Sequence, residues 1–269
     1  MIEQNPWVSK KMVAEQFGIA RSTLYLKQKQ IYKDKKYLEE VLFAMKENPY
    51  YGQRRLALVL GRNVKLVRRI MRKYGLRPKK KKKKFNKPED ENKPPSGIPN
   101  RLKTICPIRP TVVYAGDFTH FVWYGTLVYL ATVLDLFTRE IVGWSIGLHH
   151  SGPLIIEALE DAKKRRGTPF LFHSDQGSEY TSHACKEWLF KNNILPSQST
   201  KSSPWQNGWQ ESFYGRFKQE FGNIHRFKTI EDFVEAIHLQ IHYYNKKRIH
   251  SKLKMPPEKF FLLQTQKWI

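Results

Sequence analysis

The order of apolar runs after residue 110 most constrains the fold of this chain. Three strand-like runs come first, and the strands that follow alternate with helices. Strands are expected at residues 112–119, 127–134, 140–148, 170–173 and 195–198, and helices at residues 153–166, 182–192 and 204–221. Consecutive strands favour an antiparallel meander, whereas strands that alternate with helices favour parallel additions to the same sheet. The sequence therefore predicts an α/β domain built on a mixed sheet.

Three acidic residues occupy special places in this pattern. Asp117 is embedded in the first strand, Asp175 follows the fourth, and Glu211 lies about two turns into the last helix, whose start is indicated by a capping box from Ser203 to Gln206. An acid inside a strand is costly to bury without a partner, and ligands gather at strand exits in parallel sheets. Each acid alone could be a capped turn or a surface carboxylate. Together they could hold two divalent ions about 3.5–4 Å apart, the arrangement used in phosphodiester displacement.

The spacing of these acids and the segments around them resemble one family. Between Asp175 and Glu211 lie 211 − 175 − 1 = 35 residues, as in the D,D(35)E signature of DDE transposases and retroviral integrases. The matching segments are Asp117-Phe118-Thr119, Tyr129 to Arg139, Ile141-Val142-Gly143-Trp144, His173 to Gly177, and Tyr244-Asn245 with Arg248, His250 and Ser251. Over residues 37–260 the chain resembles the second-frame (OrfB-type) transposases of bacterial insertion sequences, which carry an integrase catalytic core. Gln206 departs from the family pattern, more than a turn before Glu211.

The resemblance implies a ribonuclease-H-like mixed sheet and a chemistry. Asp117, Asp175 and Glu211 would be the catalytic residues and would bind two Mg2+ (or Mn2+) ions. They would cleave the ends of an insertion sequence and join the freed 3′-hydroxyl to target DNA. The partners implied are double-stranded DNA (terminal inverted repeats and target), further copies of the chain in a homo-oligomer on paired ends, and an upstream-frame (OrfA-type) partner or fusion. A copy-out, paste-in route through a circular intermediate is implied as well.

Two other functions remain open from the residues. One is a nuclease of the ribonuclease-H superfamily that cuts without joining strands. The other is a non-catalytic DNA-binding regulator that uses only the N-terminal helices. The three intact acids argue against the regulator, because a binding protein has no need to keep them together.

Two residues near the acids are candidate DNA contacts. Lys218 stands seven residues after Glu211, close to two helical turns, so it is expected on the same helix face. The resemblance implies that it contacts substrate DNA, although a surface lysine is the alternative. Trp205 and Trp209 could stack on a base or cap the core, and Trp205, at the start of this helix, is expected near substrate. His173 and Glu179 flank Asp175 without matching the family's ligands, and His173 is expected to be a hydrogen-bonding residue at a strand end.

The basic residues are concentrated at the front of the chain. Of the net charge of +24, residues 1–84 carry 24 − 6 = +18 and residues 85–269 carry 24 − 18 = +6. This asymmetry points to a polyanion, most simply nucleic acid. A ribosomal or RNA-binding protein would share it, but the aliphatic and aromatic content of the second part favours a packed, enzyme-sized domain.

Two helical units are expected before residue 78. A helix from Lys10 to Phe17, a turn at Gly18 and a helix that opens at Arg21 outline a helix-turn-helix. Helices within residues 37–74 resemble the helix-turn-helix that precedes the integrase core in the same family. The expected DNA contacts are Arg21, Ser22, Thr23 and Lys27 in the first unit and Arg54, Arg55, Lys65, Arg68, Arg69 and Arg72 in the second. A helical pair used only for protein contacts is the alternative for the first unit.

A basic, proline-rich segment follows these helices and is expected to be an extended linker. It contains the run Lys79, Lys80, Lys81, Lys82, Lys83 and Lys84. Six lysines repel one another and cannot pack, so they form either a solvated run or a segment that follows the DNA backbone. Phosphate neutralisation by such a run makes binding steeply dependent on salt.

The predicted organisation has five parts. These are helix-turn-helix units at 1–35 and 36–77, the linker at 78–110, the integrase-like catalytic core at 111–228 and a C-terminal helical tail at 229–269. The tail should contain an amphipathic helix over residues 230–244 that faces the core. Arg248 and His250 could order this tail or touch DNA.

Targeting signals are absent from the sequence. It has no signal peptide and no uninterrupted apolar stretch of about 18 residues, so no membrane partner is expected. Cys106 and Cys185 lack the spacing of a zinc site or disulfide scaffold. We therefore expect a cytoplasmic, nucleoid-associated bacterial protein.

Overall fold

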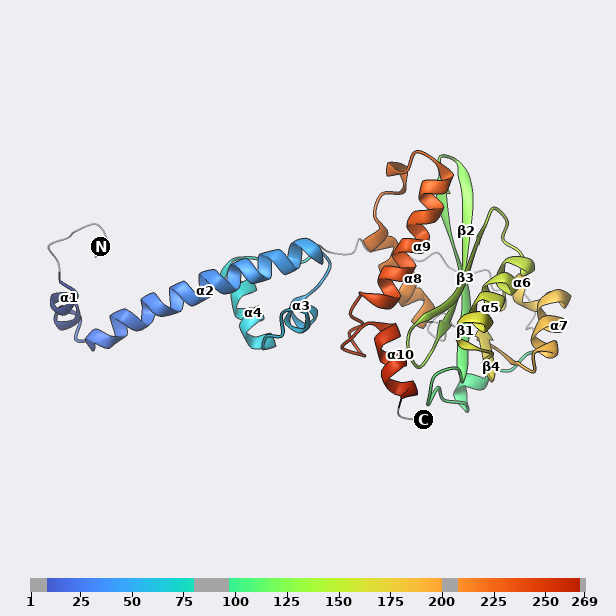
Figure 1. Ribbon diagram of the computed structural model, residues 1–269, viewed down its shortest axis with the longest axis horizontal. Helices are drawn as coiled ribbons and strands as arrows, with labels where there is room; N and C mark the ends of the chain where they lie inside the picture. Colours follow the sequence, from blue (N-terminus) through green and yellow to red (C-terminus); the bar gives the residue numbers. More distant parts are fainter. Residues whose placement is uncertain (1–8, 80–96, 200–207, 267–269) are drawn as a thin grey trace. The chain divides into compact units, whose positions relative to one another are not determined.

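The computed structural model describes residues 9–79, 97–199 and 208–266, with only the backbone described for residues 24–29. The chain divides into two compact units, residues 1–82 and 83–269 (Figure 1). This division differs from the five predicted parts, because the two helix-turn-helix units form one body and the core and tail form another.

The first unit is entirely helical in its described part. Its helices are α1 (Lys10–Gln16), α2 (Arg21–Glu47), α3 (Gln53–Leu60) and α4 (Val64–Lys73). The helices predicted to open at Arg21 and Tyr37 are one continuous helix, α2, which crosses the predicted boundary between residues 35 and 36. The reason is local, since no glycine or proline interrupts this 27-residue stretch.

Helices α2 and α4 are joined by a buried acid. Asp34 on α2 is 3% exposed. Its carboxylate accepts hydrogen bonds from Arg69 Nη2 at 2.6 Å and Lys73 Nζ at 2.8 Å, both on α4. Val41, Ile70 and other apolar residues form the small core around these contacts.

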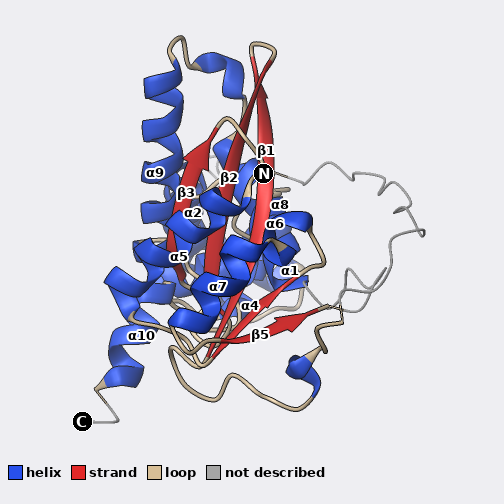
Figure 2. Ribbon diagram, turned by 90° about the vertical axis from the view of Figure 1, so that its right-hand side faces the viewer, coloured by secondary structure: helices blue, strands red, loops and turns tan. Residues whose placement is uncertain are grey.

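The second unit is built on the predicted mixed sheet. Its strands are β1 (Val113–Trp123), β2 (Thr126–Asp135), β3 (Ile141–Gly147), β4 (Leu171–Ser174) and β5 (Leu195–Gln198), in the order β3-β2-β1-β4-β5. The first three are antiparallel, with β1 and β2 forming a long hairpin (Figure 2). The strands β4 and β5 add in parallel to β1, as the alternation of strands and helices predicts.

Helices cover both faces of the sheet (Figure 1). On one face lie α5 (Gly152–Arg166), α6 (Ser178–Thr181) and α7 (His183–Lys191), and on the other α8 (Gly208–Phe221) and α9 (Ile230–Lys246). The short helix α6 was not predicted separately. The other helical segments described in this unit are the 3-10 helices at Arg101–Lys103 and Ile224–Arg226, and α10 (Pro257–Thr265). The capping box predicted for α8 lies outside the described residues.

The predicted linker is too long at its C-terminal end. The backbone amide of Arg101 donates to Ser197 Oγ at 3.0 Å, and its Nε donates to the carbonyl oxygen of Pro196 at 3.1 Å. Leu102 and Ile105 pack against the core. These two apolar side chains explain why the segment belongs to the second unit.

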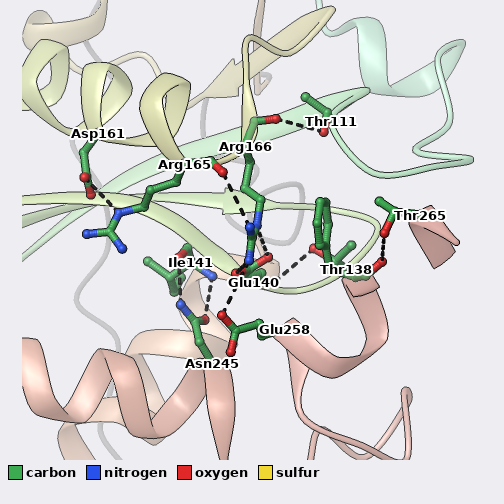
Figure 3. Close-up of polar contacts among 11 residues, drawn as sticks. Thr111, Thr138, Glu140, Ile141, Asp161, Arg165, Arg166, Asn245, Glu258 and Thr265 are labelled. Carbon is green, nitrogen blue, oxygen red and sulfur yellow. Dashed lines mark hydrogen bonds and ion pairs between the residues drawn. The ribbon is translucent and has the colours of Figure 1, made fainter. Parts of the chain in front are cut away.

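Side chains from α9 and α5 cover the free edge of β3 (Figure 3). Asn245 accepts from the Ile141 amide at 3.0 Å and donates to the Ile141 carbonyl at 2.8 Å, as a neighbouring strand would. The amide of Trp144 donates to Asp161 at 3.3 Å. Figure 3 also shows Arg166 paired with Glu140, with Glu258 of α10 3.6 Å away.

The tail is ordered against the core. As predicted, α9 buries one face, which includes Phe233, Ile237 and Ile241. Of the two roles left open for Arg248, the structure supports ordering, because this side chain forms a two-pronged ion pair with Glu220 of α8. No helix in the described ranges is both long and apolar enough to cross a membrane.

Candidate active site

Asp117 lies where β1 separates from β4. The β1–β4 ladder ends at Ala115, whereas the pairing with β2 continues and sets Asp117 opposite Thr132. Asp117 is partly exposed as a residue, but its carboxyl group is buried among protein atoms. This burial raises the pKa of Asp117 to about 8, and the Asp175 and Glu211 carboxylates act in the same direction. The hydrogen bond from the Phe118 amide, 2.8 Å long, opposes the shift.

The other two acids come from β4 and α8. Asp175 directly follows β4, and its Oδ1 accepts a hydrogen bond from the Gly177 amide at 3.0 Å. Glu211 lies in the first turn of α8 and is exposed. Their effect on the pKa of Asp117 places all three predicted acids in one electrostatic neighbourhood.

The donor set suits a divalent cation of the Mg2+ class. Oxygen ligands and a surplus of negative charge are what such a cation requires, and the repulsion among these carboxylates is relieved by a cation. Among the described residues, no three acidic, His or Cys side chains are arranged to coordinate a metal ion. One oxygen of Asp117 and one of Asp175 instead accept from nearby backbone amides.

A buried polar network fixes α8 beneath Asp117. Gln210 is fully buried, and its amide nitrogen donates to the Ala115 carbonyl at 2.6 Å, where β1 has lost its β4 partner. The Tyr214 hydroxyl donates to the carbonyl oxygen of Asp117 at 2.6 Å and lies 2.7 Å from Thr132 Oγ1. Thr132 also donates to Gln210 Oε1 at 3.3 Å. The helix that carries Glu211 is thus hydrogen-bonded to the strand that carries Asp117.

Sequence reasoning missed this network. Its signal is nevertheless present, since Gln210 and Tyr214 are four residues apart and lie on one helix face. A polar pair on the apolar face of a helix implies buried partners. The tertiary packing determines which backbone and side-chain groups of β1 and β2 become the partners of Gln210 and Tyr214.

A fourth acid lies close to the three predicted ones. Glu179 is 7% exposed, and its carboxylate is 3.3 Å from Nε2 of His150. It too raises the pKa of Asp117. His150 is held edge-on to Phe118, with ring centres 4.5 Å apart.

His173 has the role predicted for it. Its Nδ1 is 2.9 Å from Ser197 Oγ at the end of β4. Burial lowers the pKa of His173 to about 4, so the ring is neutral near pH 7. A neutral ring hydrogen-bonded to a neighbouring strand serves structure.

Lys218 is engaged within the second unit. Its Nζ donates to the carbonyl oxygen of His120 at 2.7 Å and lies 5.0 Å from the ring centre of Phe121. The spacing from Glu211 puts both residues on one side of α8, as predicted. Trp205 and the lysines Lys80, Lys81, Lys82, Lys83 and Lys84 lie outside the described residues.

Most of the basic residues predicted in the first unit are exposed. The exposed set is Arg21, Ser22, Arg54, Lys65, Arg68, Arg72 and Lys79, while Thr23 is half-buried and the side chain of Lys27 is not described. Arg68 also donates to Gln53 at 3.1 Å. These positions leave most of the predicted set accessible to a ligand.

Arg55 and Arg69 are used inside the first unit. Arg55 is 8% exposed, donates to the Tyr50 carbonyl at 2.9 Å and stacks over Tyr51. It was predicted as a DNA contact, whereas the structure buries its side chain within the first unit. Arg69 remains half-exposed, but its guanidinium is paired with Asp34.

Comparisons with known proteins match this architecture. Two family models described as "Integrase core domain" match residues 107–204 and 192–257. The chain is 33% identical over 222 residues to the transposase for insertion sequence element IS904 of Lactococcus lactis, covering 78% of this chain and 87% of that protein. It is also 33% identical over 195 residues to a transposase-like protein of Haemophilus influenzae, covering 71% of this chain and 89% of that protein.

The chain belongs to the second-frame (OrfB-type) transposases of bacterial insertion sequences. Its fold is likewise shared with solved structures. The transposase aligns with a chain from the cryo-EM structure of the simian T-cell lymphotropic virus intasome in complex with PP2A regulatory subunit B56 gamma, with a TM-score of 0.50 and 17% identity. This alignment covers 82% of the transposase and 74% of that chain. It supports the ribonuclease-H-like mixed sheet as the fold of the second unit.

Proposed function

We propose that this transposase is a DDE strand-transfer enzyme that cleaves the ends of an insertion sequence and joins them to target DNA. The observation that carries the proposal is the convergence of three acids from separate elements, Asp117 in β1, Asp175 after β4 and Glu211 on α8, close enough that the other two oppose the ionisation of Asp117. A site that gathers several acids suits a reaction assisted by metal ions. The membership in a transposase family supports the same reaction.

Asp117, Asp175 and Glu211 would hold two Mg2+ or Mn2+ ions. When bound, such ions activate an attacking oxygen and stabilise the leaving oxygen of a phosphodiester. The chain's own contribution is positional. Gln210 and Tyr214 hold α8 on β1, so that Glu211 is presented to the acids at the strand ends.

The N-terminal unit would bind the double-stranded DNA on which this site acts. Its exposed basic side chains, together with the lysine run, supply charge for phosphate contacts. We further propose that the chain acts on the bacterial chromosome in the cytoplasm, as a homo-oligomer on paired ends and with an upstream-frame partner or fusion. The family supports these proposals.

A gel assay with labelled terminal-repeat DNA and Mg2+ tests the proposed reaction. The native chain is compared with Asp117→Asn, Asp175→Asn and Glu211→Gln, and with Glu235→Gln as a control, since Glu235 is exposed on α9. Nicking and strand joining should appear with the native chain and the control. Each of the three active-site variants should retain DNA binding and lose both reactions.

The alternatives give different results in the same assay. Nicking without joining would favour a nuclease. DNA binding without either reaction, even with an upstream partner supplied, would favour a regulator and overturn the proposal.

A further inference from the structure

A basic pocket lies on the opposite flank of α8 from Glu211. It has a volume of about 470 Å3 and is formed by the end of β2 and the residues after it, by α8, and by the end of α9 and the segment after it. Its charged and aromatic lining includes Arg139, Trp209, Arg216 and Lys252. Two of the segments that resemble the transposase family, Tyr129 to Arg139 and the one that contains His250, both contribute to this lining. Neither segment contains one of the three acids.

Arg139 is the unusual residue of this pocket. It is 8% exposed, and its Nη1 is buried without a hydrogen-bond partner among the described residues. Its backbone is fixed, because the Tyr244 hydroxyl donates to the Arg139 carbonyl at 2.9 Å. A buried guanidinium nitrogen without an acceptor is costly, so the charge of Arg139 is not fully satisfied by the fold.

The nearest candidate acid does not satisfy this guanidinium. The Asp135 carboxylate accepts from the backbone amides of Thr111, Phe137 and Thr138 at 2.7–3.0 Å. No ion pair to Arg139 is present in the described part of the chain, and no Asp or Glu is among the described residues that line the pocket. The lining of the pocket therefore carries an excess of positive charge.

The pocket is separate from the catalytic acids. Residues Ser212 and Arg216 are four apart on α8 and face the pocket, whereas Glu211 and Lys218 are seven apart and share another flank. Trp209 adds an aromatic wall, with the Arg139 guanidinium carbon 5.4 Å from its ring centre. Its volume falls within the range of about 300–1,000 Å3 that is typical of small-ligand sites.

We propose that this pocket binds one nucleotide of a DNA strand, with a phosphate against Arg139, Arg216 and Lys252 and the base or sugar against Trp209. Arginine binds phosphate oxygens through paired hydrogen bonds, and an aromatic ring gives a stacking surface for any base. The inference rests on the proposed function, since it names a second place where the same DNA is held. The pocket would anchor a DNA strand on α8, the helix that carries Glu211.

Photocrosslinking of the full-length chain tests this pocket separately from the N-terminal unit. Duplex oligonucleotides with a single-stranded overhang carry 5-iodouracil at successive positions, are irradiated without metal, and the crosslinked residue is mapped by mass spectrometry. A crosslink at Trp209 is expected for at least one position. Arg216→Ala and Lys252→Ala should each lower its yield by about tenfold, the effect of losing one charge-assisted contact.

Matched controls separate pocket binding from general charge. Lys247→Ala removes an exposed lysine near Lys252 that does not line the pocket, and it should leave the Trp209 crosslink unchanged. Crosslinks found only outside residues 209–216, or an equal loss with Lys247→Ala, would overturn the inference. Loss of the crosslink with an equal concentration of inorganic phosphate would also overturn it, since the pocket would then be a small-anion site.

The nicking assay on the same preparation distinguishes this inference from the proposed function. Nicking without a Trp209 crosslink overturns the pocket and leaves the catalytic proposal standing. A Trp209 crosslink without nicking supports the pocket and overturns the catalytic proposal. A chain that binds no oligonucleotide overturns both.

Discussion

Both burial and neighbouring carboxylates oppose the ionisation of the Asp117 side chain. Burial raises its pKa to about 8, and Asp175, Glu211 and Glu179 add repulsion. The folded chain therefore retains a proton on Asp117 that the unfolded chain, with an Asp pKa near the ordinary value of 3.8, releases at lower pH. A bound cation would remove this conflict by replacing the proton.

The first prediction concerns the pH dependence of stability without metal. Between pH values of about 4 and 8 the folded state binds more protons than the unfolded state, so the free energy of unfolding should fall as the pH rises through this window, by a few kcal/mol in total. Asp117→Asn should flatten this dependence and be more stable than the native chain at pH 8. Urea unfolding followed by circular dichroism measures both effects.

Two comparisons complete this prediction. Glu235→Gln should keep the native pH dependence, because that residue is exposed. At pH 8, Mg2+ should stabilise the native chain more than it stabilises the Asp117→Asn variant. An identical pH dependence for the native chain and Asp117→Asn would contradict the argument.

The second prediction concerns the buried pair of Arg248 and Glu220, whose side chains are 3% and 9% exposed. Arg248→Ala leaves a buried carboxylate uncompensated and should lower the free energy of unfolding by about 3–5 kcal/mol. Lys191→Ala breaks the exposed pair with Glu187 and should change it by less than about 1 kcal/mol. Denaturant unfolding gives both values, and equal effects would show that burial of the pair is unimportant.

At the scale of elements, α8 connects the proposed chemistry to the sheet. Its apolar face packs on the core through Phe213, Phe217 and Phe221. Its polar residues Gln210 and Tyr214 reach the backbone of β1. The packing therefore fixes the distance of α8 from the sheet, and the hydrogen bonds fix its rotation about its own axis. Together they set the orientation of Glu211.

The third prediction tests this positioning. Tyr214→Phe removes the hydroxyl that binds the Asp117 carbonyl and should raise the Mg2+ concentration for half-maximal nicking by about tenfold, at the low end of effects for outer-shell partners. Tyr114→Phe removes another buried tyrosine hydroxyl, bonded to the Gly167 carbonyl at 3.3 Å. It should cost a similar stability of about 1 kcal/mol and leave the Mg2+ dependence unchanged. An unchanged Mg2+ dependence for Tyr214→Phe would remove its positioning role.

The strands and helices of the second unit could be predicted because their patterns are local. The run around Asp117 reads as a strand, and the mixed topology follows from the order of elements. By contrast, the continuity of α2 was missed because two apolar patterns were taken for two helices. The burial of Arg55 and the partners of Gln210 depend on long-range packing, which residue spacing does not encode.

At the scale of the whole molecule, most of the positive charge and the three proposed catalytic acids belong to different units. Residues 1–84 carry +18, whereas the acids lie in the unit that starts at Lys83. Within the first unit, some basic residues face outward and others stabilise the fold. This separation predicts different consequences for residues of the same charge.

The fourth prediction compares exposed and internally paired arginines in full-length protein. Arg72→Ala and Lys65→Ala should each reduce the slope of the logarithm of the DNA-binding constant against the logarithm of the salt concentration by about 1, because each would remove one of the proposed phosphate contacts. Arg69→Ala should instead lower the melting temperature of the first unit, because Asp34 loses a partner. Fluorescence anisotropy at several salt concentrations and thermal unfolding provide the two readouts. Equal salt slopes for all variants and the native chain would contradict it.

Both outer strands of the sheet, β3 and β5, are partly covered by the chain itself. Asn245 and Asp161 bind the backbone of β3, and the Pro99 to Arg101 segment binds that of β5. Sheets that pair edge to edge need free backbone N–H and C=O groups on their outer strands. A second copy would consequently find these backbone groups of β3 and β5 already bonded, so substitutions at Ile141, Trp144, Pro196 or Gln198 are poor choices for separating copies of this transposase.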